Sequence, residues 1–295
     1  MYTLIFVLLI SYALQLSVQA DSLQPKTIFQ NVIAFGDSYT DNGSQTRFYK
    51  DGSNEISPNS LHPSTSDIQR ACDGPLWIEY LADIYKAQLF DFARSGSTAN
   101  NNLILRYTED MHTQVEAYER TNTPRVGSAY FIWTGVNDMT ELFIRYPQQR
   151  QGRIDIMDAI INSISDDLYK LADSGANHIV LMGLIPLDAA NIYKNISIQT
   201  NYELRRLVAN YNSRLFDLMS LFQSDNPNIS ATFFNTHRVF KKLIDGDKSG
   251  VLSRMDCQGG NSCRDLIWWD DLHPTTKTHA LLATAVYEKL VELQW

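Results

Sequence analysis

The sequence predicts an α/β protein in which a parallel β-sheet is covered by helices on both faces. Short apolar segments alternate along the chain with longer amphipathic ones. Each short segment is almost continuously apolar, as expected for strands that are buried on both faces. Strands that alternate with helices in this way form parallel sheets with helices packed on either side.

Five segments are apolar enough to be candidate strands. They cover residues 32–35, 88–92, 129–133, 179–183 and 231–234. Right-handed crossovers would place the carboxyl ends of these strands along one edge of the sheet. Because ligands of such open sheets bind beyond that edge, we expect functional residues just after the strands.

Three amphipathic helices can be placed from apolar residues that are spaced three and four apart. The first covers 157–171 and is followed by Gly175, a residue type that commonly ends helices. The second covers 204–222, and the third covers 282–293 at the end of the chain. These helices supply the apolar faces that would cover the sheet.

Residues 45–70 interrupt this pattern. They are rich in Ser, Asn, Pro and Asp and show no hydrophobic periodicity. The segment is too long for an ordinary connection, so it is either disordered or a loop with a function. Because it leaves from the end of the first strand, we expect it to shape the mouth of a site. We find no repeat or linker that divides the chain.

The first twenty of the 295 residues contain no charged side chain. This run has about the length of a signal-peptide core and is short for a membrane span. Val18 and Ala20 place small residues at the two positions that signal peptidase reads. We therefore expect a signal peptide at 1–20, a single domain at 21–295 and an extracellular protein. An uncleaved membrane anchor is the alternative.

The formal net charge of −8 argues against nucleic acid as a partner. An acidic protein repels phosphates, and no basic run reverses this effect. No later segment is apolar over a length that could cross a bilayer, so we expect no stable membrane association after signal cleavage. The expected protein is a monomer.

Three cysteines, Cys72, Cys257 and Cys263, cannot all pair with one another. Cys257 and Cys263 bracket a short segment with two glycines, which favours a disulfide between them in an oxidising compartment. Cys72 would then be free and buried; three reduced cysteines are the alternative. The spacing suits no zinc site and no His-Glu-x-x-His motif is present, so we expect neither a metal nor a cofactor.

Sequons begin at Asn42, Asn195 and Asn228. The last two are expected glycosylation sites in loops or at helix edges, which agrees with export. Asn42 lies four residues after Ser38. A glycan there would crowd the serine, so we do not expect one.

Residues suited to acyl transfer follow the predicted strands. Ser38 comes after the first strand, Gly96 after the second and Asn137 after the third, whereas Asp270 and His273 precede the last helix. Attack on an ester carbonyl requires a nucleophile, donors for the oxyanion, a general base and a carboxylate that orients the base. Together the five residues provide these parts.

Taken singly, each part has a structural explanation. A Gly-Asp-Ser sequence and Gly96 are common in turns, and Asn137 could belong to a helix cap. The Asp-x-x-His-Pro sequence is more specific, because proline suits a helix start and would hold His273 at the helix N-terminus. His237 also follows a predicted strand and is the rival base. The combination of all parts favours catalysis over structure.

Four sequence blocks resemble those of the GDSL or SGNH hydrolases. They are FGDSYTDNG at 35–43, FARSGSTAN at 92–100, GVND at 135–138 and DDLHP at 270–274. The resemblance extends over nearly all of the chain after residue 20. The segment GPLWIEYLA at 74–82 also looks like a segment of the secreted carbohydrate acetyl esterases in this group. Tyr39 replaces the leucine of the namesake motif, and Arg94 and Ser95 replace small or apolar residues.

This resemblance implies a flavodoxin-like, three-layer α/β/α sandwich, the SGNH hydrolase fold, with five parallel strands in the order 2-1-3-4-5. It implies that Ser38 is the nucleophile and also donates its backbone N–H to the oxyanion. Gly96 would be the second backbone donor and Asn137 a side-chain donor. His273 would act as base and then as acid, oriented by Asp270, because the family spacing is Asp-x-x-His.

The expected function is that of a secreted serine esterase, and the resemblance favours deacetylation of saccharides derived from hemicellulose. Trp268, Trp269 and Tyr39 lie near the blocks, where aromatic faces could stack on sugar rings, although large aromatics often belong to the core. The alternative is a lipase-type hydrolase of lysophospholipids or other lipid esters, because the same blocks serve both. A secreted binding protein without activity is a third alternative.

Overall fold

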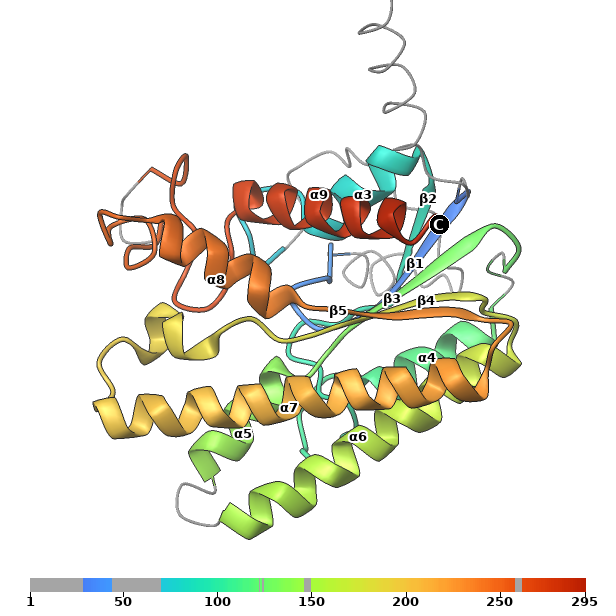
Figure 1. The fold of residues 1–295 in the computed structure, drawn as a ribbon, viewed down its shortest axis with the longest axis horizontal. Helices are drawn as coiled ribbons and strands as arrows, with labels where there is room; N and C mark the ends of the chain where they lie inside the picture. Colours follow the sequence, from blue (N-terminus) through green and yellow to red (C-terminus); the bar gives the residue numbers. More distant parts are fainter. Residues whose placement is uncertain (1–28, 44–69, 122, 124, 146–149, 258–261) are drawn as a thin grey trace, which may run out of the picture.

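The computed structural model describes residues 29–43, 70–121, 123, 125–145, 150–257 and 262–295 (Figure 1). The predicted signal peptide at 1–20 and residues 45–69 of the predicted loop lie outside this part. Five strands form one parallel sheet in the order β2-β1-β3-β4-β5. They are β1 (Asn31–Gly36), β2 (Gln88–Asp91), β3 (Ser128–Trp133), β4 (His178–Met182) and β5 (Ser230–Phe234). This confirms the implied strand order.

Helices cover both faces of the sheet (Figure 1). One face carries α3 (Trp77–Tyr85), α8 (Thr236–Gly246) and α9 (Thr276–Glu292). The other carries α4 (Met111–Glu119), α5 (Val136–Arg145), α6 (Arg150–Asp173) and α7 (Ile198–Asp225). Short 3-10 helices, η1 (Leu187–Ala189) and η2 (Asn191–Tyr193), follow β4. The three-layer α/β/α prediction is therefore confirmed, and the three predicted helices correspond to α6, α7 and α9.

The core is centred on β1 and β3, whose residues are all buried. Continuous burial on both faces explains why these strands contain few polar residues. Trp77 of α3 packs edge-on against Phe131 and Trp133 of β3, with ring centroids 5.7 Å apart in both pairs. The strand ends that carry the candidate site therefore rest on a tightly packed base.

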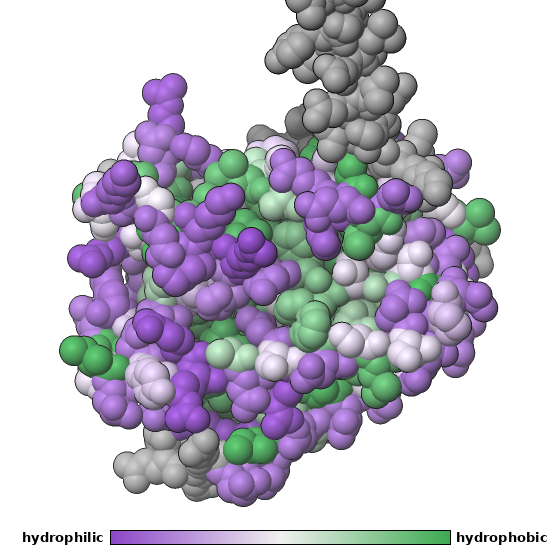
Figure 2. Space-filling model, viewed as in Figure 1, coloured by the Kyte–Doolittle hydropathy of each residue, from purple (hydrophilic) through white to green (hydrophobic). Residues whose placement is uncertain are grey.

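The edge strand β5 is less buried than the central strands, since only Phe234 among its residues is fully buried. Figure 2 shows a paler, less polar band between α9 and α7, where Figure 1 places β5. None of the helices within the described residues combines the length and the hydropathy of a membrane span.

Cys257 and Cys263 are joined by a disulfide, as the sequence favoured. Cys72 is unpaired, as expected, but only partly buried, which corrects the expectation that it would be buried. Its Sγ lies 3.5 Å from the carboxylate of Asp73, and its burial raises the pKa of the thiol. A thiol held in its neutral form is a weak nucleophile, so Cys72 is not a rival to Ser38.

The three sequons differ in exposure. Asn195 and Asn228 are exposed, so a glycan at either position remains a prediction that the fold permits. Asn42 is buried, with 4% of its surface exposed, and its backbone N–H donates to Asp91 Oδ2 at 2.9 Å. This burial agrees with the expectation that Asn42 carries no glycan.

Candidate functional site

The residues predicted for catalysis meet at the carboxyl edge of the sheet. Ser38 lies in the turn after β1, Gly96 in the turn after β2, and Asn137 in the first turn of α5, directly after β3. His273 lies on the loop before α9 and is 235 positions from Ser38 along the chain. Because β1 lies between β2 and β3, the loops that follow these three strands converge on one place.

Ser38, His273 and Asp270 form a continuous chain of polar contacts. Ser38 Oγ lies 2.9 Å from His273 Nε2, and His273 Nδ1 lies 2.7 Å from Asp270 Oδ2. An ionised carboxylate only accepts hydrogen bonds, so Nδ1 carries the ring proton and Nε2 can accept the proton of the serine hydroxyl. This arrangement holds the tautomer that a general base requires.

Asp270 is held as a carboxylate by donors from its own turn. Its Oδ1 accepts from the backbone N–H of Leu272 at 2.8 Å and of His273 at 2.6 Å. Burial raises the pKa of Asp270, but the hydrogen bonds and the positive charge of His273 outweigh it, and the net pKa is lowered. Asp271 is exposed and makes no such contact with His273, so the structure places Asp270 and not Asp271 at the imidazole.

The turn that carries Ser38 depends on Gly36. Gly36 has a φ of +141°, and a Cβ at this position would lie 2.0 Å from the carbonyl oxygen of Trp133. The backbone then turns sharply, with the N–H groups of Thr40 and Asp41 both donating to the carbonyl of Asp37 at 2.9 Å. The strand therefore ends in a tight turn that leaves Ser38 at its tip, with 7% of the residue exposed.

Asp37, beside the nucleophile, is fully buried and bonds within its own turn. Its Oδ1 accepts from the Tyr39 N–H at 3.1 Å, whereas its Oδ2 has no partner among the described residues. Burial raises the pKa of Asp37 to about 8, and the nearby charges of Asp138 and Asp41 add to this effect. The sequence indicated nothing of this role, in which a buried, protonated acid supports the turn.

Two backbone N–H groups are free to bind an oxyanion. Gly96 has a φ of +83° in a turn closed by the Ser97 N–H, which donates to the carbonyl of Arg94 at 3.0 Å. Within the part of the chain that the structure describes, no protein acceptor takes the N–H of Ser38 or of Gly96. Both groups therefore retain a donor that a developing oxyanion could use.

The orientation of the Asn137 carboxamide is set by two neighbours. Its Nδ2 donates to the Ser97 carbonyl at 2.8 Å, and its Oδ1 accepts from Arg106 Nη2 at 3.3 Å. A carbonyl only accepts and a guanidinium only donates, so the two ends of the amide cannot exchange places. One N–H of Nδ2 is thereby used, and the second remains for a ligand. Arg106, which also pairs with Glu141 at 3.2 Å, was not found by sequence reasoning.

The aromatic residues near the site divide into core and surface. Tyr39 is fully buried against Trp133, with ring centroids 4.9 Å apart, so the expectation that it could stack on a sugar is wrong. Its hydroxyl instead donates to the Leu272 carbonyl at 3.1 Å. Trp268 is also fully buried, and only Trp269 is partly exposed, 6.5 Å from the His273 ring.

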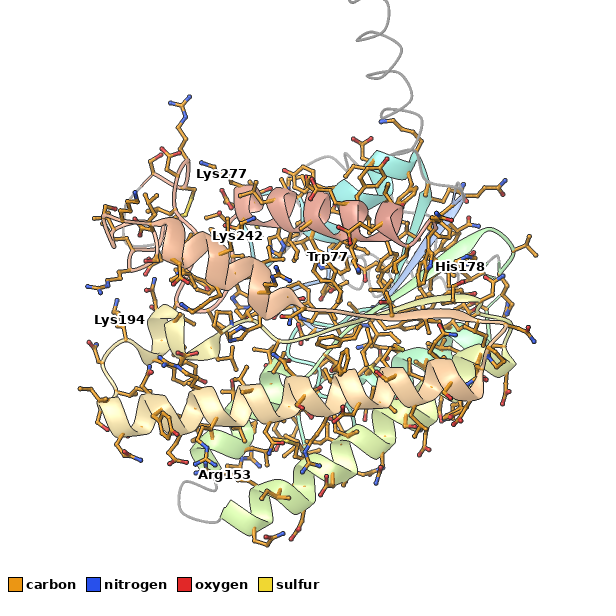
Figure 3. The ribbon with its side chains drawn as sticks, viewed as in Figure 1. Trp77, Arg153, His178, Lys194, Lys242 and Lys277 are labelled. Atoms are coloured by element: carbon orange, nitrogen blue, oxygen red, sulfur yellow. A yellow bond between two sulfur atoms is a disulfide. The ribbon has the colours of Figure 1, made fainter. Side chains whose placement is uncertain are left out.

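The other described histidines lie in different places. His178 begins β4, at the opposite edge of the sheet, and packs against aromatic rings (Figure 3). His112 bonds to the buried Asp167, which lies on α6. His237 lies on α8 and His279 is buried in α9. The structure brings none of these four to the Ser38 hydroxyl, so His237 is not supported as a rival base.

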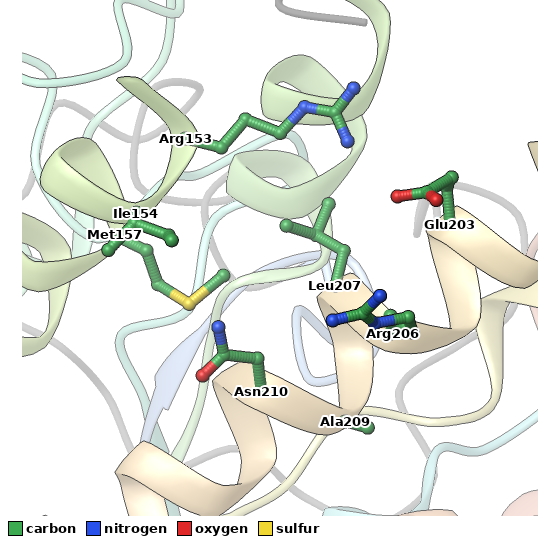
Figure 4. Close-up of a pocket in the computed structure, with 8 residues that line it drawn as sticks. All are labelled: Arg153, Ile154, Met157, Glu203, Arg206, Leu207, Ala209 and Asn210. Carbon is green, nitrogen blue, oxygen red and sulfur yellow. The ribbon is translucent and has the colours of Figure 1, made fainter. Parts of the chain in front are cut away.

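Two cavities that described residues line do not contain the predicted catalytic residues. The first, of about 280 Å³, lies between α6 and α7, where Met157 and Arg153 lie across from Leu207 and Asn210 (Figure 4). The second, of about 450 Å³, is lined by residues of α7 and β5, including Phe216 and Phe233, together with His237. Among the described residues, no group of three or more acidic, histidine or cysteine side chains could hold a metal ion.

Comparisons with known proteins follow the same blocks. The family model of GDSL-like lipases and acylhydrolases matches residues 32–286. A thermolabile hemolysin of Vibrio parahaemolyticus is 24% identical over 304 residues, which cover 92% of this chain and 65% of the hemolysin. An acetylesterase of Hypocrea jecorina is 25% identical over 193 residues, which cover 59% of this chain and 53% of that protein. The chain thus spans less than two thirds of the length of these relatives.

Two solved structures share the fold. A variant of an acetyl-xylooligosaccharide esterase from Geobacillus gives a TM-score of 0.52 at 14% identity, covering 90% of this chain and 96% of that chain. A catalytic variant of an acetylxylan esterase from Geobacillus stearothermophilus gives 0.51 at 15% identity, covering 88% and 94%. At such identities the likeness is one of fold.

Proposed function

Because the chain belongs to the GDSL-like lipase/acylhydrolase family, we propose that it hydrolyses carboxylic esters through an acyl-enzyme intermediate on Ser38. The observation that carries the proposal is the contact series from Ser38 Oγ through His273 to Asp270, with distances of 2.9 and 2.7 Å. A serine hydroxyl is a weak nucleophile at neutral pH, and an adjacent imidazole is the usual means of activating it.

In the first half of the reaction, Ser38 Oγ attacks the ester carbonyl while its proton passes to His273 Nε2. Asp270 stabilises the imidazolium that forms, because it accepts the Nδ1 proton at 2.7 Å. The carbonyl oxygen becomes negative and is met by the N–H groups of Ser38 and Gly96 and by Asn137 Nδ2. His273 then donates its proton to the leaving alcohol, and the acyl group stays on Ser38.

In the second half, a water molecule takes the place of the alcohol. His273 accepts a proton from the water, the resulting hydroxide attacks the acyl carbon, and the proton returns to Ser38 Oγ as the acid leaves. Proton transfer of this kind typically accelerates a reaction by about 10²–10⁴-fold. Each donor to the oxyanion typically contributes about 3–4 kcal/mol to transition-state stabilisation.

The substrate class that fits best is the acetyl ester of a saccharide, with hemicellulose-derived sugars as the foremost candidates. The support is the resemblance to an acetylesterase of Hypocrea jecorina and the partly exposed Trp269 beside His273, since an aromatic face suits a sugar ring. Secretion is part of the proposal, supported by the uncharged residues 1–20 and by the disulfide between Cys257 and Cys263. A monomeric state stays a prediction.

A lipid ester is the second candidate, and one surface feature favours it. Leu105 and Tyr107 are 59% and 103% exposed and flank Arg106, whose guanidinium contacts Asn137. Exposed apolar side chains so close to the oxyanion donor would suit an acyl chain or a lipid surface. The name of the matching family model, which includes lipases, agrees with this candidate.

A serine-reactive fluorophosphonate probe tests the activity. We expect it to label the wild-type protein and not Ser38→Ala, whereas an inactive binding protein would not be labelled in either form. Acetylated xylo-oligosaccharides assayed against lysophosphatidylcholine then decide between the two substrate classes. A rate that stays flat from about pH 8 to about pH 4 would contradict His273 as the base, because a protonated imidazole cannot accept a proton.

A further inference from the structure

Gln114 of α4 is a buried polar residue that the reaction described above does not use. Only 1% of its surface is exposed, although it lies in a helix whose other buried residues, such as Val115 and Tyr118, pack as apolar or aromatic groups. A buried carboxamide is stable only when its oxygen and nitrogen both find partners. The partners of Gln114 therefore explain why it is there.

The carboxamide of Gln114 joins two segments of the candidate site. Its Oε1 accepts from the Gly36 N–H at 2.8 Å, and its Nε2 donates to the Gly36 carbonyl at 2.9 Å. The same Nε2 donates to Ser97 Oγ at 3.0 Å. The oxygen and both N–H groups of the amide are thus used within one buried network.

The position of Gly36 at the end of β1 explains why the Gln114 side chain is needed as its hydrogen-bond partner. The pairing between β1 and β2 ends with Ala34 opposite Asp91; beyond it the Arg94 N–H still donates to the Gly36 carbonyl at 3.0 Å, but the Gly36 N–H has no backbone acceptor on that side among the described residues. The Gln114 oxygen supplies the acceptor that a neighbouring strand would otherwise offer to the Gly36 N–H. The side chain therefore completes the sheet at the place where the nucleophile turn begins.

Both segments that Gln114 joins carry donors to the proposed oxyanion. Gly36 lies two residues before Ser38, and Ser97 directly follows Gly96. Ser97 also accepts the Asn137 Nδ2 hydrogen bond through its carbonyl, at 2.8 Å. The Gln114 side chain is thus linked, through one or two hydrogen bonds, to the segments that position all three oxyanion donors.

We infer that Gln114 is a positioning residue, which holds the N–H groups of Ser38, Gly96 and Asn137 in register for one oxyanion. This inference rests on the proposed ester hydrolysis. Gln114 does not touch the substrate; it acts through Gly36 and Ser97. Small displacements of such donors are costly, because a shift of about 1 Å can lower a rate about 10²-fold.

Two replacements of Gln114 test the inference. Gln114→Met keeps the size of the side chain and removes every hydrogen bond, and Gln114→Glu keeps the shape but replaces the Nε2 donor with a carboxyl oxygen. We expect kcat on an activated acetyl ester to fall about 10- to 100-fold, with KM changed by less than about threefold. The Ki of an arylboronic acid should rise in parallel. Its adduct with Ser38 Oγ is a tetrahedral anion, which the same oxyanion donors would bind.

Val115→Ala is the matched control, since Val115 is fully buried in the same helix and takes no part in the network. It should lower Tm while leaving kcat and the boronic acid Ki within about twofold of wild type. If Val115→Ala lowers kcat as much as Gln114→Met does, Gln114 has only a structural role. Full kcat in folded Gln114→Met or Gln114→Glu would also overturn the inference.

A milder variant covers the case in which the Gln114 variants do not fold. Ser97→Ala removes one of the three bonds and should lower kcat by a few fold, with KM maintained; an unchanged kcat contradicts the inference. The proposed function is judged separately on the wild-type protein. If wild type neither hydrolyses acetyl esters nor reacts with fluorophosphonate at Ser38, the proposed function fails, whereas an active wild type with unaffected variants refutes only the role of Gln114.

Discussion

The side of the site that carries Ser38 and the side that carries His273 are built in different ways. Ser38 stands at the end of a fully buried central strand, and its turn is supported by buried groups, including Gly36, Asp37 and Gln114. His273 lies on a half-exposed loop outside the sheet, where its backbone N–H and its ring both bond to Asp270 in the same turn.

The two halves of the site should therefore respond differently to substitution. The Ser38 half depends on long-range packing, so a change there should affect folding as well as rate. The His273 half depends on contacts within its own turn and on a few long-range bonds. One is the bond from the Ile192 N–H to the Asp271 carbonyl at 2.9 Å, and another is a tether, the bond from the Tyr39 hydroxyl to the Leu272 carbonyl at 3.1 Å. A change there should alter the rate with less effect on stability.

The largest effect is expected from Gly36→Ala. The added Cβ would meet the Trp133 carbonyl oxygen at 2.0 Å, in a backbone conformation with φ of +141°. We expect the free energy of unfolding to fall by about 4 kcal/mol or more, measured by urea denaturation. Gly246→Ala is the control, because nothing lies within 4 Å of its added Cβ; an equal loss in both variants would contradict this account of Gly36.

Asp37→Asn should change how stability depends on pH. The pKa of Asp37 is raised to about 8, above the 3.8 of an unfolded chain, so the folded state keeps a proton that the unfolded state releases between these values. The stabilisation is complete below about pH 4 and is lost as the pH rises toward about 8. Asparagine cannot ionise, so unfolding measured at about pH 5 and about pH 8 should show a smaller loss in Asp37→Asn.

The exposed Asp217 of α7 provides the control for this experiment. Asp217→Asn should retain the pH dependence of wild type. A wild-type stability that does not fall between about pH 5 and about pH 8 more steeply than that of Asp37→Asn would refute the raised pKa of Asp37.

Asn137→Ala should keep the fold and lower kcat by about 10²–10³-fold, because it removes one donor to the oxyanion. Arg106→Met should have a smaller effect, about 10-fold, since it frees the carboxamide to rotate but leaves the donor in place. Steady-state kinetics on one acetyl ester measures both. Normal turnover in Asn137→Ala would remove Asn137 from the oxyanion role.

Tyr39→Phe should give the smallest effect. Loss of the hydroxyl breaks the tether to Leu272 and should cost about 1 kcal/mol of stability, with a kcat a few fold lower as His273 becomes less well placed. Tyr130→Phe loses a buried hydroxyl contact with Tyr118, at 2.8 Å in the core, and should leave kcat unchanged. Equal kcat values in the two variants would show that the tether does not position His273.

The strands could be predicted from the sequence because a strand that is buried on both faces appears as a run of consecutive apolar residues. All five predicted strands match the observed ones to within one residue at either end. The blocks around Ser38 and His273 could also be found from the sequence, because the residue types of Gly36-Asp-Ser and Asp-x-x-His are specific over a short stretch. By contrast, α3, α4, α5 and α8 were not assigned from periodicity, because these helices span only 9 to 11 residues, too few for the spacing of three and four to repeat clearly.

The supporting residues could not be predicted because their partners are distant in sequence. Gln114 contacts Gly36 across 78 positions, and its type alone would suit an exposed helix face. Pro274 was expected to start the last helix, but it pairs with Trp268 in an isolated bridge, and α9 begins at Thr276 with Thr275 as its cap. This bridge overrides the preference of proline for a helix start.

The contact between Ser38 and His273 has a consequence for biosynthesis. During translation the serine emerges early, and the imidazole follows only after 235 more residues. A nascent chain therefore holds a hydroxyl with no base beside it, and hydrolysis through this pair must wait until His273 has been synthesised and folded into place. The onset of hydrolysis should thus report the arrival of the last segment on the sheet, later than the appearance of helical circular dichroism.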